Sequence, residues 1–245
     1  MTPTRTPVTL ARDRLIVALD QKEREDSERL VATLGDSVTF YKVGWVTLLT
    51  AGLDFVRYLL ERGKHVFLDL KIYDVPNTVG EAIDRVASLG VRFATVHGNS
   101  ENIQAAVRGK GGSDLQILAV TVLTSLNEHD VRQLYSLPDH VPLARHAVNV
   151  AKRMMDLGCD GVITSPHEIE LIRAEVPDKT LIVAPGIRLA GETTHDHKRP
   201  GTPFESIKAG ADYLVVGRSI YRSEDPKGQA ERYVGEIERG MAART

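Results

Sequence analysis

Eight short apolar segments recur along the chain, and most of them end in a polar residue or a glycine. The segments are five to nine residues long and rich in Val, Ile, Leu, Phe and Tyr. That length and composition are typical of β-strands. We therefore predict eight strands, over residues 14–20, 38–44, 65–71, 92–98, 115–123, 161–165, 180–186 and 213–218.

The segments between these strands have the apolar spacing of amphipathic helices. In residues 78–89, apolar side chains recur at positions i, i+3, i+4 and i+7 from Val79. Thr78 and Glu81 fit a capping box at the start of this helix, and Gly90 fits its end. The same pattern predicts further helices over residues 23–34, 52–61, 141–157, 167–175 and 226–240.

Strands and helices alternate along the chain without a linker or a low-complexity segment between them. Eight such units are typical of a parallel (β/α)8 barrel, the TIM-barrel fold of the α/β class. The 245 residues suit this fold, because α/β barrels of roughly 250 residues commonly form one domain. We expect a single domain over residues 1–245, with residues 1–13 as an N-terminal extension.

Strand alternation places several ionisable residues at one end of the predicted barrel. In the third strand, Asp69 and Lys71 fall on the face opposite to an aliphatic face that helices should cover. The same rule turns Asp20, Lys42 and His97 inward at the ends of three other strands. Active sites of such barrels lie at the carboxyl ends of the strands, so these side chains should share one site.

The third strand runs into the sequence Asp-Leu-Lys-Ile-Tyr-Asp, which contains Asp69, Lys71 and Asp74. Charges at the end of an apolar strand are costly to bury unless they are paired. They could form a salt-bridge network that closes the barrel, or an active site together with Lys42. Neighbouring carboxylates favour a protonated lysine, which would act as a proton donor and not as a Schiff-base nucleophile.

Two loops have the composition of an anion site. Arg188 ends the run Ala-Pro-Gly-Ile-Arg after the seventh strand, and Gly217 and Arg218 follow the eighth strand. Loops at these positions in TIM barrels often bind phosphate through backbone N–H groups, and arginines add charge-assisted bonds. The alternative is an ordinary glycine turn with two surface arginines.

Residues 189–203 form a long polar connection that is rich in Gly, Thr, His and Lys. Such a connection is either a lid that closes over an anion or a solvated loop. His195 and His197 lie within it, but two histidines spaced i, i+2 are weak evidence for a metal, and we expect no metal site. Trp45 and Cys159 are interpreted as packing residues.

Composition narrows the functional classes. The net charge of −2 provides no electrostatic footprint for nucleic acid. The longest apolar run is five residues, whereas a membrane span needs about 20, so we expect no membrane segment. Residues 1–14 have no apolar signal-peptide core, and one cysteine allows no intrachain disulfide. We therefore expect a cytoplasmic protein.

Seven short motifs, which occur in the family's order over about residues 14–235, resemble the orotidine 5′-monophosphate decarboxylase family of the bacterial type. The most specific of them is the ten-residue run DLKIYDVPNT, from Asp69 to Thr78. The others are IVALD with Asp20, FYKVG with Lys42, TVHG with His97, TVLTS with Thr124, PGIR with Arg188, and VGRSI with Gly217 and Arg218.

This resemblance implies decarboxylation of orotidine 5′-monophosphate to UMP, the last step of de novo pyrimidine synthesis, without a metal or a cofactor. It implies that Lys71 protonates C6 of the pyrimidine as carbon dioxide leaves. Lys42, Asp69 and Asp74 would complete a charged tetrad, with Asp74 supplied by the other subunit of a homodimer.

The resemblance also implies a set of substrate contacts. His197 stands where the bacterial members usually carry a glutamine that reaches the phosphate. The residues implied in substrate binding are Asp20, Lys42, Asp69, Thr78, His97, Thr124, Arg188, His197, Gly217 and Arg218.

Two other functions remain open from the residues alone. A magnesium-dependent lyase similar to 3-keto-L-gulonate 6-phosphate decarboxylase shares the Asp-x-Lys-x-x-Asp pattern, but places a carboxylate where this chain has Lys42. A non-catalytic barrel that binds nucleotides as a sensor is the other alternative, and the charged set of Lys42, Asp69, Lys71 and Asp74 argues against it.

Overall fold

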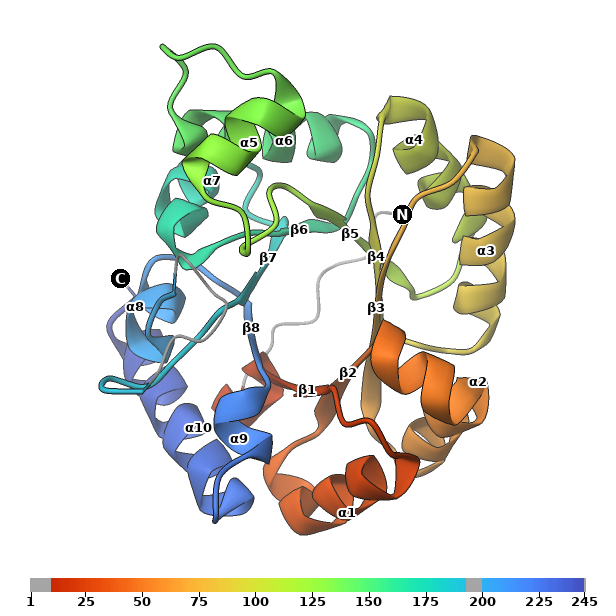
Figure 1. Cartoon of the computed structure of the whole chain (residues 1–245), viewed down its shortest axis with the longest axis vertical. Helices are drawn as coiled ribbons and strands as arrows, with labels where there is room; N and C mark the ends of the chain where they lie inside the picture. The colour runs from red at the N-terminus through yellow and green to blue at the C-terminus, as the bar shows by residue number, and fades with distance from the viewer. Residues whose placement is uncertain (1–9, 193–199, 245) are drawn as a thin grey trace.

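In the computed structural model, which describes residues 10–192 and 200–244, eight parallel strands close into a barrel. Each strand pairs with the next in chain order, and β1 pairs with β8 to close the ring. Figure 1 looks into this ring, with the helices outside it. The predicted (β/α)8 fold is confirmed. The strands are β1 (Leu15–Leu19), β2 (Phe40–Gly44), β3 (His65–Ile72), β4 (Phe93–Val96), β5 (Gln116–Val120), β6 (Gly161–Ile163), β7 (Leu181–Pro185) and β8 (Tyr213–Val216).

The helices follow the strands in the sequence, with α9 and α10 after β8, and they cover the outer face of the barrel (Figure 1). Short 3-10 turns occupy Ala11–Arg14, Gly35–Ser37 and Pro166–Glu168. The α-helices are α1 (Arg24–Leu34), α2 (Trp45–Glu61), α3 (Pro76–Ser88), α4 (Ser100–Gly109), α5 (Glu128–Tyr135), α6 (Leu143–Asp156), α7 (Ile169–Glu175), α8 (Pro203–Lys208), α9 (Arg218–Tyr221) and α10 (Pro226–Ala242).

Side-chain alternation along the strands separates two apolar layers. In β1, Leu15, Val17 and Leu19 join the large cluster between the sheet and the helices. Ile16 and Ala18 point the other way and belong to a smaller cluster inside the barrel. Both faces of a parallel strand are therefore buried, as a barrel wrapped by helices requires. The orientation predicted for this strand is confirmed.

The amino-terminal end of the barrel interior is filled by aromatic rings. The rings of Phe40, Phe93 and Tyr213 pack with centroids 5.0 to 5.8 Å apart. The Arg92 guanidinium lies 5.8 to 5.9 Å from the same three centroids and donates to the Tyr213 hydroxyl at 3.0 Å. Edge-to-face rings and a cation over their faces stabilise such packing, so this end of the barrel is closed.

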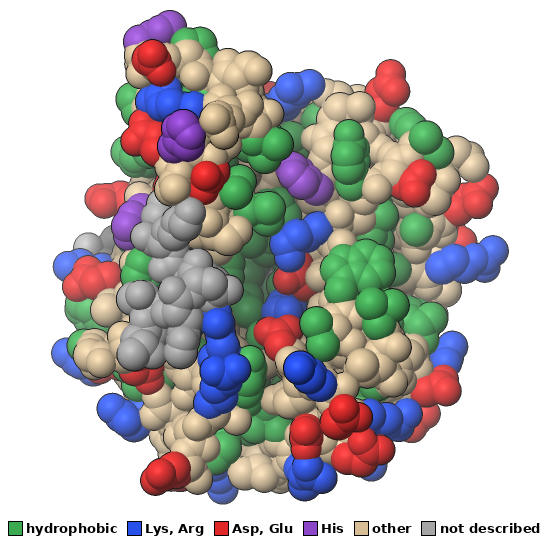
Figure 2. Space-filling model, in the orientation of Figure 1, with side chains coloured by type: hydrophobic (Ala, Val, Ile, Leu, Met, Phe, Trp, Pro, Cys, Tyr) green, Lys and Arg blue, Asp and Glu red, His purple; other side chains and the backbone are tan. Residues whose placement is uncertain are grey.

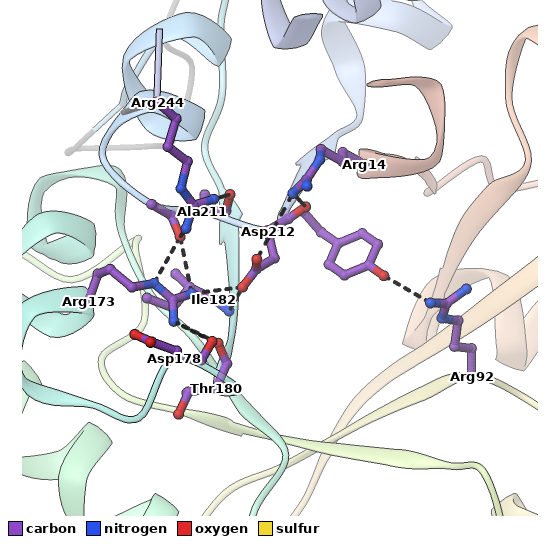
Figure 3. Close-up of polar contacts among 11 residues, drawn as sticks. Arg14, Arg92, Arg173, Asp178, Thr180, Ile182, Ala211, Asp212 and Arg244 are labelled. Carbon is purple, nitrogen blue, oxygen red and sulfur yellow. Dashed lines mark hydrogen bonds and ion pairs between the residues drawn. The ribbon is translucent and has the colours of Figure 1, made fainter. Parts of the chain in front are cut away.

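A buried carboxylate next to this end joins several elements (Figure 3). Asp212 is fully buried, and its Oδ2 accepts bonds from Arg173 Nη2 at 2.8 Å and from the Ile182 backbone at 2.9 Å. The Arg14 guanidinium lies 4.0 Å from the other carboxylate oxygen. Because a buried charge is costly without partners, these contacts fix α7, β7 and β8 in one arrangement.

Some predicted helix boundaries were wrong. The helix α3 begins at Pro76, and no side chain caps it, so the capping box of Thr78 and Glu81 does not form. Proline suits the first helical turn, because its φ is already helical and its missing N–H has no partner there. The expected helix end holds, since Gly90 follows the C-cap with φ 81°.

Other helices differ in extent from the prediction. The helix α2 begins at Trp45 and is kinked at Gly52, where the predicted helix started. Residues 167–175 divide into a 3-10 turn capped by Ser165 and the helix α7. Four helices have no counterpart among the predicted ranges, namely α4, α5, α8 and α9.

The two residues interpreted as packing residues differ in their burial. Cys159 is buried, as expected, and burial raises the pKa of its thiol to about 12. Trp45 is 54% exposed, so its interpretation as a packing residue was wrong. In the two described ranges, no helix is both long and apolar enough to span a membrane.

Candidate active site

A cavity of about 240 Å³ opens at the carboxyl ends of the strands. In Figure 2, basic and acidic side chains surround a hollow at the centre of this face. The cavity wall is apolar at its floor and charged toward its mouth. Its lining residues are Ala18, Asp20, Lys42, Phe67, Asp69, Lys71, Val120, Val122, Leu123, Thr124, Ile163, Pro185, Gly186, Arg188, Val215, Gly217 and Arg218.

Two lysines and two carboxylates alternate along one wall of the cavity. The Lys42 ammonium donates to Asp20 Oδ1 at 3.1 Å and lies 3.7 Å from Asp69 Oδ2. Lys71 Nζ donates to the other Asp69 oxygen, Oδ1, at 2.8 Å. The strand ends thus bring together Asp20, Lys42, Asp69 and Lys71, as predicted, in an order that alternates in charge.

Asp69 is the centre of this group. Its side chain is 15% exposed, and burial alone would raise the pKa of its carboxyl group. The Lys42 and Lys71 ammonium groups, with hydrogen bonds from Lys71 and Thr95, outweigh burial and hold the pKa of Asp69 below its usual value. The carboxylate is therefore ionised.

Lys71 reaches the cavity from an irregular part of its strand. The register shifts here, because the interval from Leu68 to Ile72 in β3 pairs with the shorter interval from Ala94 to Val96 in β4. Within this bulge Lys71 has a φ of 48°, a region that residues other than glycine rarely adopt. Bulges re-aim side chains at the rims of barrels. Strand alternation therefore predicted that Lys71 points inward, but it did not predict the bulge that turns the side chain in that direction.

Thr95 was not singled out in the sequence, although it contacts both residues. It is fully buried in β4, donates to Asp69 Oδ1 at 2.8 Å and accepts from the Lys71 backbone N–H at 3.0 Å. Threonine is a common β-branched residue in strands, so the residue type alone did not indicate a functional role for Thr95. The inward parity that it shares with His97 was the only available indication.

Gly44, at the end of β2, was also overlooked. A Cβ at Gly44 would lie 3.1 Å from Lys42 Nζ and 3.7 Å from Asp20 Oδ1. The distance to Lys42 is tighter than most Cβ contacts, so a side chain would press on the ammonium group. The glycine therefore leaves room for the Lys42–Asp20 ion pair.

Three of the predicted site residues lie outside the cavity lining. Asp74 and Thr78 are exposed, at the start of α3 and in its first turn, and Asp74 Oδ1 accepts from the Val75 backbone at 2.7 Å. The ring of His97 lies beside Tyr73, with centroids 6.2 Å apart. Burial and the nearby Lys71 ammonium lower the pKa of His97. None of the three lines the cavity within this one chain.

An exposed apolar face lies beside the cavity mouth. Its members come from α2 and from the connection between β3 and α3, and the two segments adjoin because Trp45 Nε1 donates to the Leu70 carbonyl at 2.9 Å. Patches of this kind mark interaction surfaces more often than isolated apolar residues do. The apolar face comprises Trp45, Val46, Leu49, Leu53, Tyr73 and Val75, of which Leu49 is 78% exposed.

Two arginines lie across the cavity from the lysines. Arg188 is buried, and burial is the main cause that lowers the pKa of its guanidinium, with Arg218 as a further cause. Gly186 has φ 79°, which turns the chain sharply after β7, and Gly217 precedes the short helix α9. Two like charges facing one cavity are stabilised by an anion between them.

The profile of the orotidine 5′-phosphate decarboxylase / HUMPS family matches residues 13–233. The chain belongs to this family. An orotidine 5′-phosphate decarboxylase of Nitrobacter winogradskyi is 46% identical over 231 residues, which cover 93% of this chain and 94% of that protein. One from Bradyrhizobium diazoefficiens is 44% identical and matches 97% of this chain and 100% of its own length.

A solved member of the family shares the fold. The crystal structure of orotidine 5′-phosphate decarboxylase from Lactobacillus acidophilus superposes with a TM-score of 0.78 at 36% identity. It covers 92% of this chain and 99% of its own. The resemblance inferred from the motifs is thereby confirmed.

The long connection after β7 is described only in part, up to residue 192 and from residue 200. Its ends are joined by a bridge between Ile187 and Gly201, and Tyr233 donates to Glu192 at 2.6 Å. His197 and His195 lie outside the described residues, and so does the centre of the predicted lid. Over residues 10–192 and 200–244, no cluster of three or more His, Cys, Asp or Glu side chains is suited to a metal ion.

Proposed function

We propose that this chain decarboxylates orotidine 5′-monophosphate to UMP, the last step of de novo pyrimidine synthesis, without a metal or a cofactor. The observation that carries the proposal is the alternating series Asp20, Lys42, Asp69 and Lys71 on one wall of a cavity with two arginines opposite. Membership of the family supports the same reaction. The whole chain would form one catalytic domain, with residues 1–13 as an extension.

The charges of the cavity suggest how the substrate lies. Its phosphate would bind between Arg188 and Arg218, at the backbone of Gly217. The ribose would contact Asp20 and Lys42 on the opposite wall. The pyrimidine would then occupy the remaining part, against apolar side chains and Thr124.

The reaction breaks the bond between C6 of the pyrimidine and its carboxylate. Carbon dioxide leaves, and the electron pair stays on C6, a ring carbon with no electron sink. The Lys71 ammonium stabilises this charge and then donates its proton to C6. Its side chain is 37% exposed, so solvent can return the proton to the neutral amine.

Asp69 serves this step by its position. Because its Oδ1 accepts from Lys71 Nζ, it aims the ammonium into the cavity. The distant phosphate would contribute binding energy that holds the substrate at this point. His97 and His197 are proposed as further substrate contacts.

A homodimer would complete the site. Asp74 and Thr78 lie outside the cavity of their own chain, and they border the apolar face around Tyr73 and Val75. A second copy that covers this face would remove it from water and bring the partner subunit's Asp74 toward the cavity. Asp74 would thus be the fourth member of the charged tetrad, and Thr78 a ligand contact across the dimer.

The two alternatives meet specific objections. In a magnesium-dependent lyase the cation would need carboxylate ligands. Here the Lys42 ammonium lies 3.7 Å from the Asp69 carboxylate and would repel a cation bound there. A nucleotide sensor would have no use for a lysine held in a strained backbone at the cavity mouth. A cytoplasmic location is proposed as well, since the chain has a single buried cysteine and no disulfide to form.

The deciding experiment measures UMP formation from orotidine 5′-monophosphate in the presence of a chelator. We expect full conversion, with release of carbon dioxide and no dependence on added magnesium. Activity that disappears in the chelator and returns with magnesium would favour the lyase. Tight binding of UMP without any turnover would favour the sensor.

A further inference from the structure

The peptide group between Leu70 and Lys71 lies outside the regular pairing of the barrel. The register between β3 and β2 ends at Asp69, and the register with β4 passes from Leu68 directly to Ile72. Backbone N–H and C=O groups that leave a sheet need other partners. Here both groups of one peptide find a side chain.

The two partners come from different elements. Trp45 Nε1, at the first residue of α2, donates to the Leu70 carbonyl at 2.9 Å. The Thr95 hydroxyl in β4 accepts from the Lys71 N–H at 3.0 Å. The same peptide is therefore held at its oxygen by one side chain and at its nitrogen by another. We call Trp45 and Thr95 the peptide clamp.

The clamp acts where the backbone is least favourable. Lys71 has a φ of 48°, and such a conformation persists only when the surrounding structure determines it. Thr95 also donates to Asp69 Oδ1 at 2.8 Å, the oxygen that accepts from Lys71 Nζ. One hydroxyl thus fixes both the backbone of the lysine and the carboxylate that orients its ammonium.

We propose that Thr95 and Trp45 are positioning residues for the proton donor Lys71, an inference that rests on the proposed decarboxylation. Neither lines the cavity, so they act through the bulge peptide and through Asp69. A displaced donor costs rate and not substrate affinity, because the phosphate contacts are on the opposite wall. The clamp should therefore govern kcat and leave KM nearly unchanged.

The main test replaces Thr95 by valine, which keeps the shape and removes the hydroxyl. We expect kcat to fall by roughly 10- to 100-fold, as small displacements of catalytic groups do, with little change in KM. Thr95→Ser restores the hydroxyl and should recover most of the rate. Thr121→Val is the matched control, because Thr121 is also buried and donates to the Ile163 carbonyl at 3.0 Å, away from Lys71.

A second variant covers the other end of the peptide. Trp45→Phe removes the N–H donor from a half-exposed ring and should lower kcat in the same direction, with the oligomeric state checked by sedimentation. Since both side chains hold one peptide, the double variant should lose less than the product of the two single losses. The single variant Trp45→Phe tests the peptide clamp even if Thr95→Val fails to fold.

A readout without substrate separates this inference from the proposed function. Hydrogen exchange of the Lys71 amide should be faster in Thr95→Val than in wild type, and unchanged in Thr121→Val. A wild type without decarboxylase activity would overturn the proposed function, while the exchange data would still decide the clamp. Unchanged exchange in Thr95→Val, or a kcat within about threefold of wild type, would overturn the clamp.

Discussion

Lys42 balances the charges of the cavity at the scale of single residues. Its ammonium lies between the carboxylates of Asp20 and Asp69, with its own side chain only 12% exposed. Next to a single lysine, a buried carboxylate would compete with the amine for the one proton between them. With two lysines, Asp69 is neutralised by one ammonium and can orient the other.

Lys71→Ala should lower kcat by at least 10²- to 10⁴-fold, the usual contribution of a positioned general acid. Binding of UMP should persist, because the arginines lie on the opposite wall of the cavity. Steady-state turnover and UMP titration measure both quantities. Lys110→Ala is the matched control, since Lys110 forms a close ion pair with Asp160 away from the cavity. A Lys71→Ala rate within tenfold of wild type, about 1.4 kcal/mol in barrier height, would remove Lys71 from the proposed step.

Most of the site follows from the sequence residue by residue, for a physical reason. Period-2 alternation depends only on the backbone, so the strand pattern alone is enough to place Asp20, Lys42 and Asp69. Trp45 was misjudged because aromatic residues are usually buried, and exposure of its ring depends on the packing of α2. Positions that depend on another element, such as Thr95, give no local pattern.

At the scale of elements, type was easier to predict than extent. The eight strands agreed because each contains a run of buried apolar residues. The predicted start of α3 was wrong because the sequence carries two competing signals, a side-chain cap at Thr78 and a proline at residue 76. The fixed φ of Pro76 determines where the helix begins. The helix α9 has only four residues, which is too short for an apolar period to show.

The crossing of α3 and α4 depends on Gly109, which lies against the backbone of Gly80. A Cβ at Gly109 would lie closer than 3.0 Å to the backbone of Gly80, a distance that real contacts do not show. Gly109→Ala should therefore lower the free energy of unfolding by about 1–3 kcal/mol, the usual cost of overpacking. Urea denaturation measures the change, and Gly112→Ala is the control, because a Cβ there meets nothing within 4 Å. Equal stability of the two variants would show that the helices can separate without cost.

At the scale of the whole molecule, the two ends of the barrel have different tasks. The amino-terminal end is closed by Arg92 and by the buried Asp212 with its arginines. The carboxyl end holds the cavity and the strained Lys71. Strain at one end is tolerated only because the rest of the barrel is extensively paired.

The proposed dimer makes a prediction that involves two whole subunits. Lys71→Ala and Asp74→Ala chains are each expected to be inactive, but a heterodimer would hold one intact site and one doubly damaged site. Random exchange should restore roughly one quarter of wild-type activity, because half of the dimers are mixed. Activity is measured after subunit exchange has been verified with labelled chains.

The matched control mixes Lys71→Ala with Asp69→Ala. These two residues belong to the same chain's cavity, so no combination of subunits yields an intact site, and no activity should return. Recovery in the control as well, or in neither mixture, would contradict a site shared between subunits.

The single cysteine has a consequence for how the barrel's motions can be observed. Cys159 precedes β6, is buried in the layer between sheet and helices, and has a pKa of about 12. Alkylating reagents react with the exposed thiolate, so labelling requires that the wall near α6 and β6 first open to water. With no second thiol in the sequence, the rate of labelling in native buffer reports that one opening event, and it equals the opening frequency at reagent concentrations that outpace reclosing.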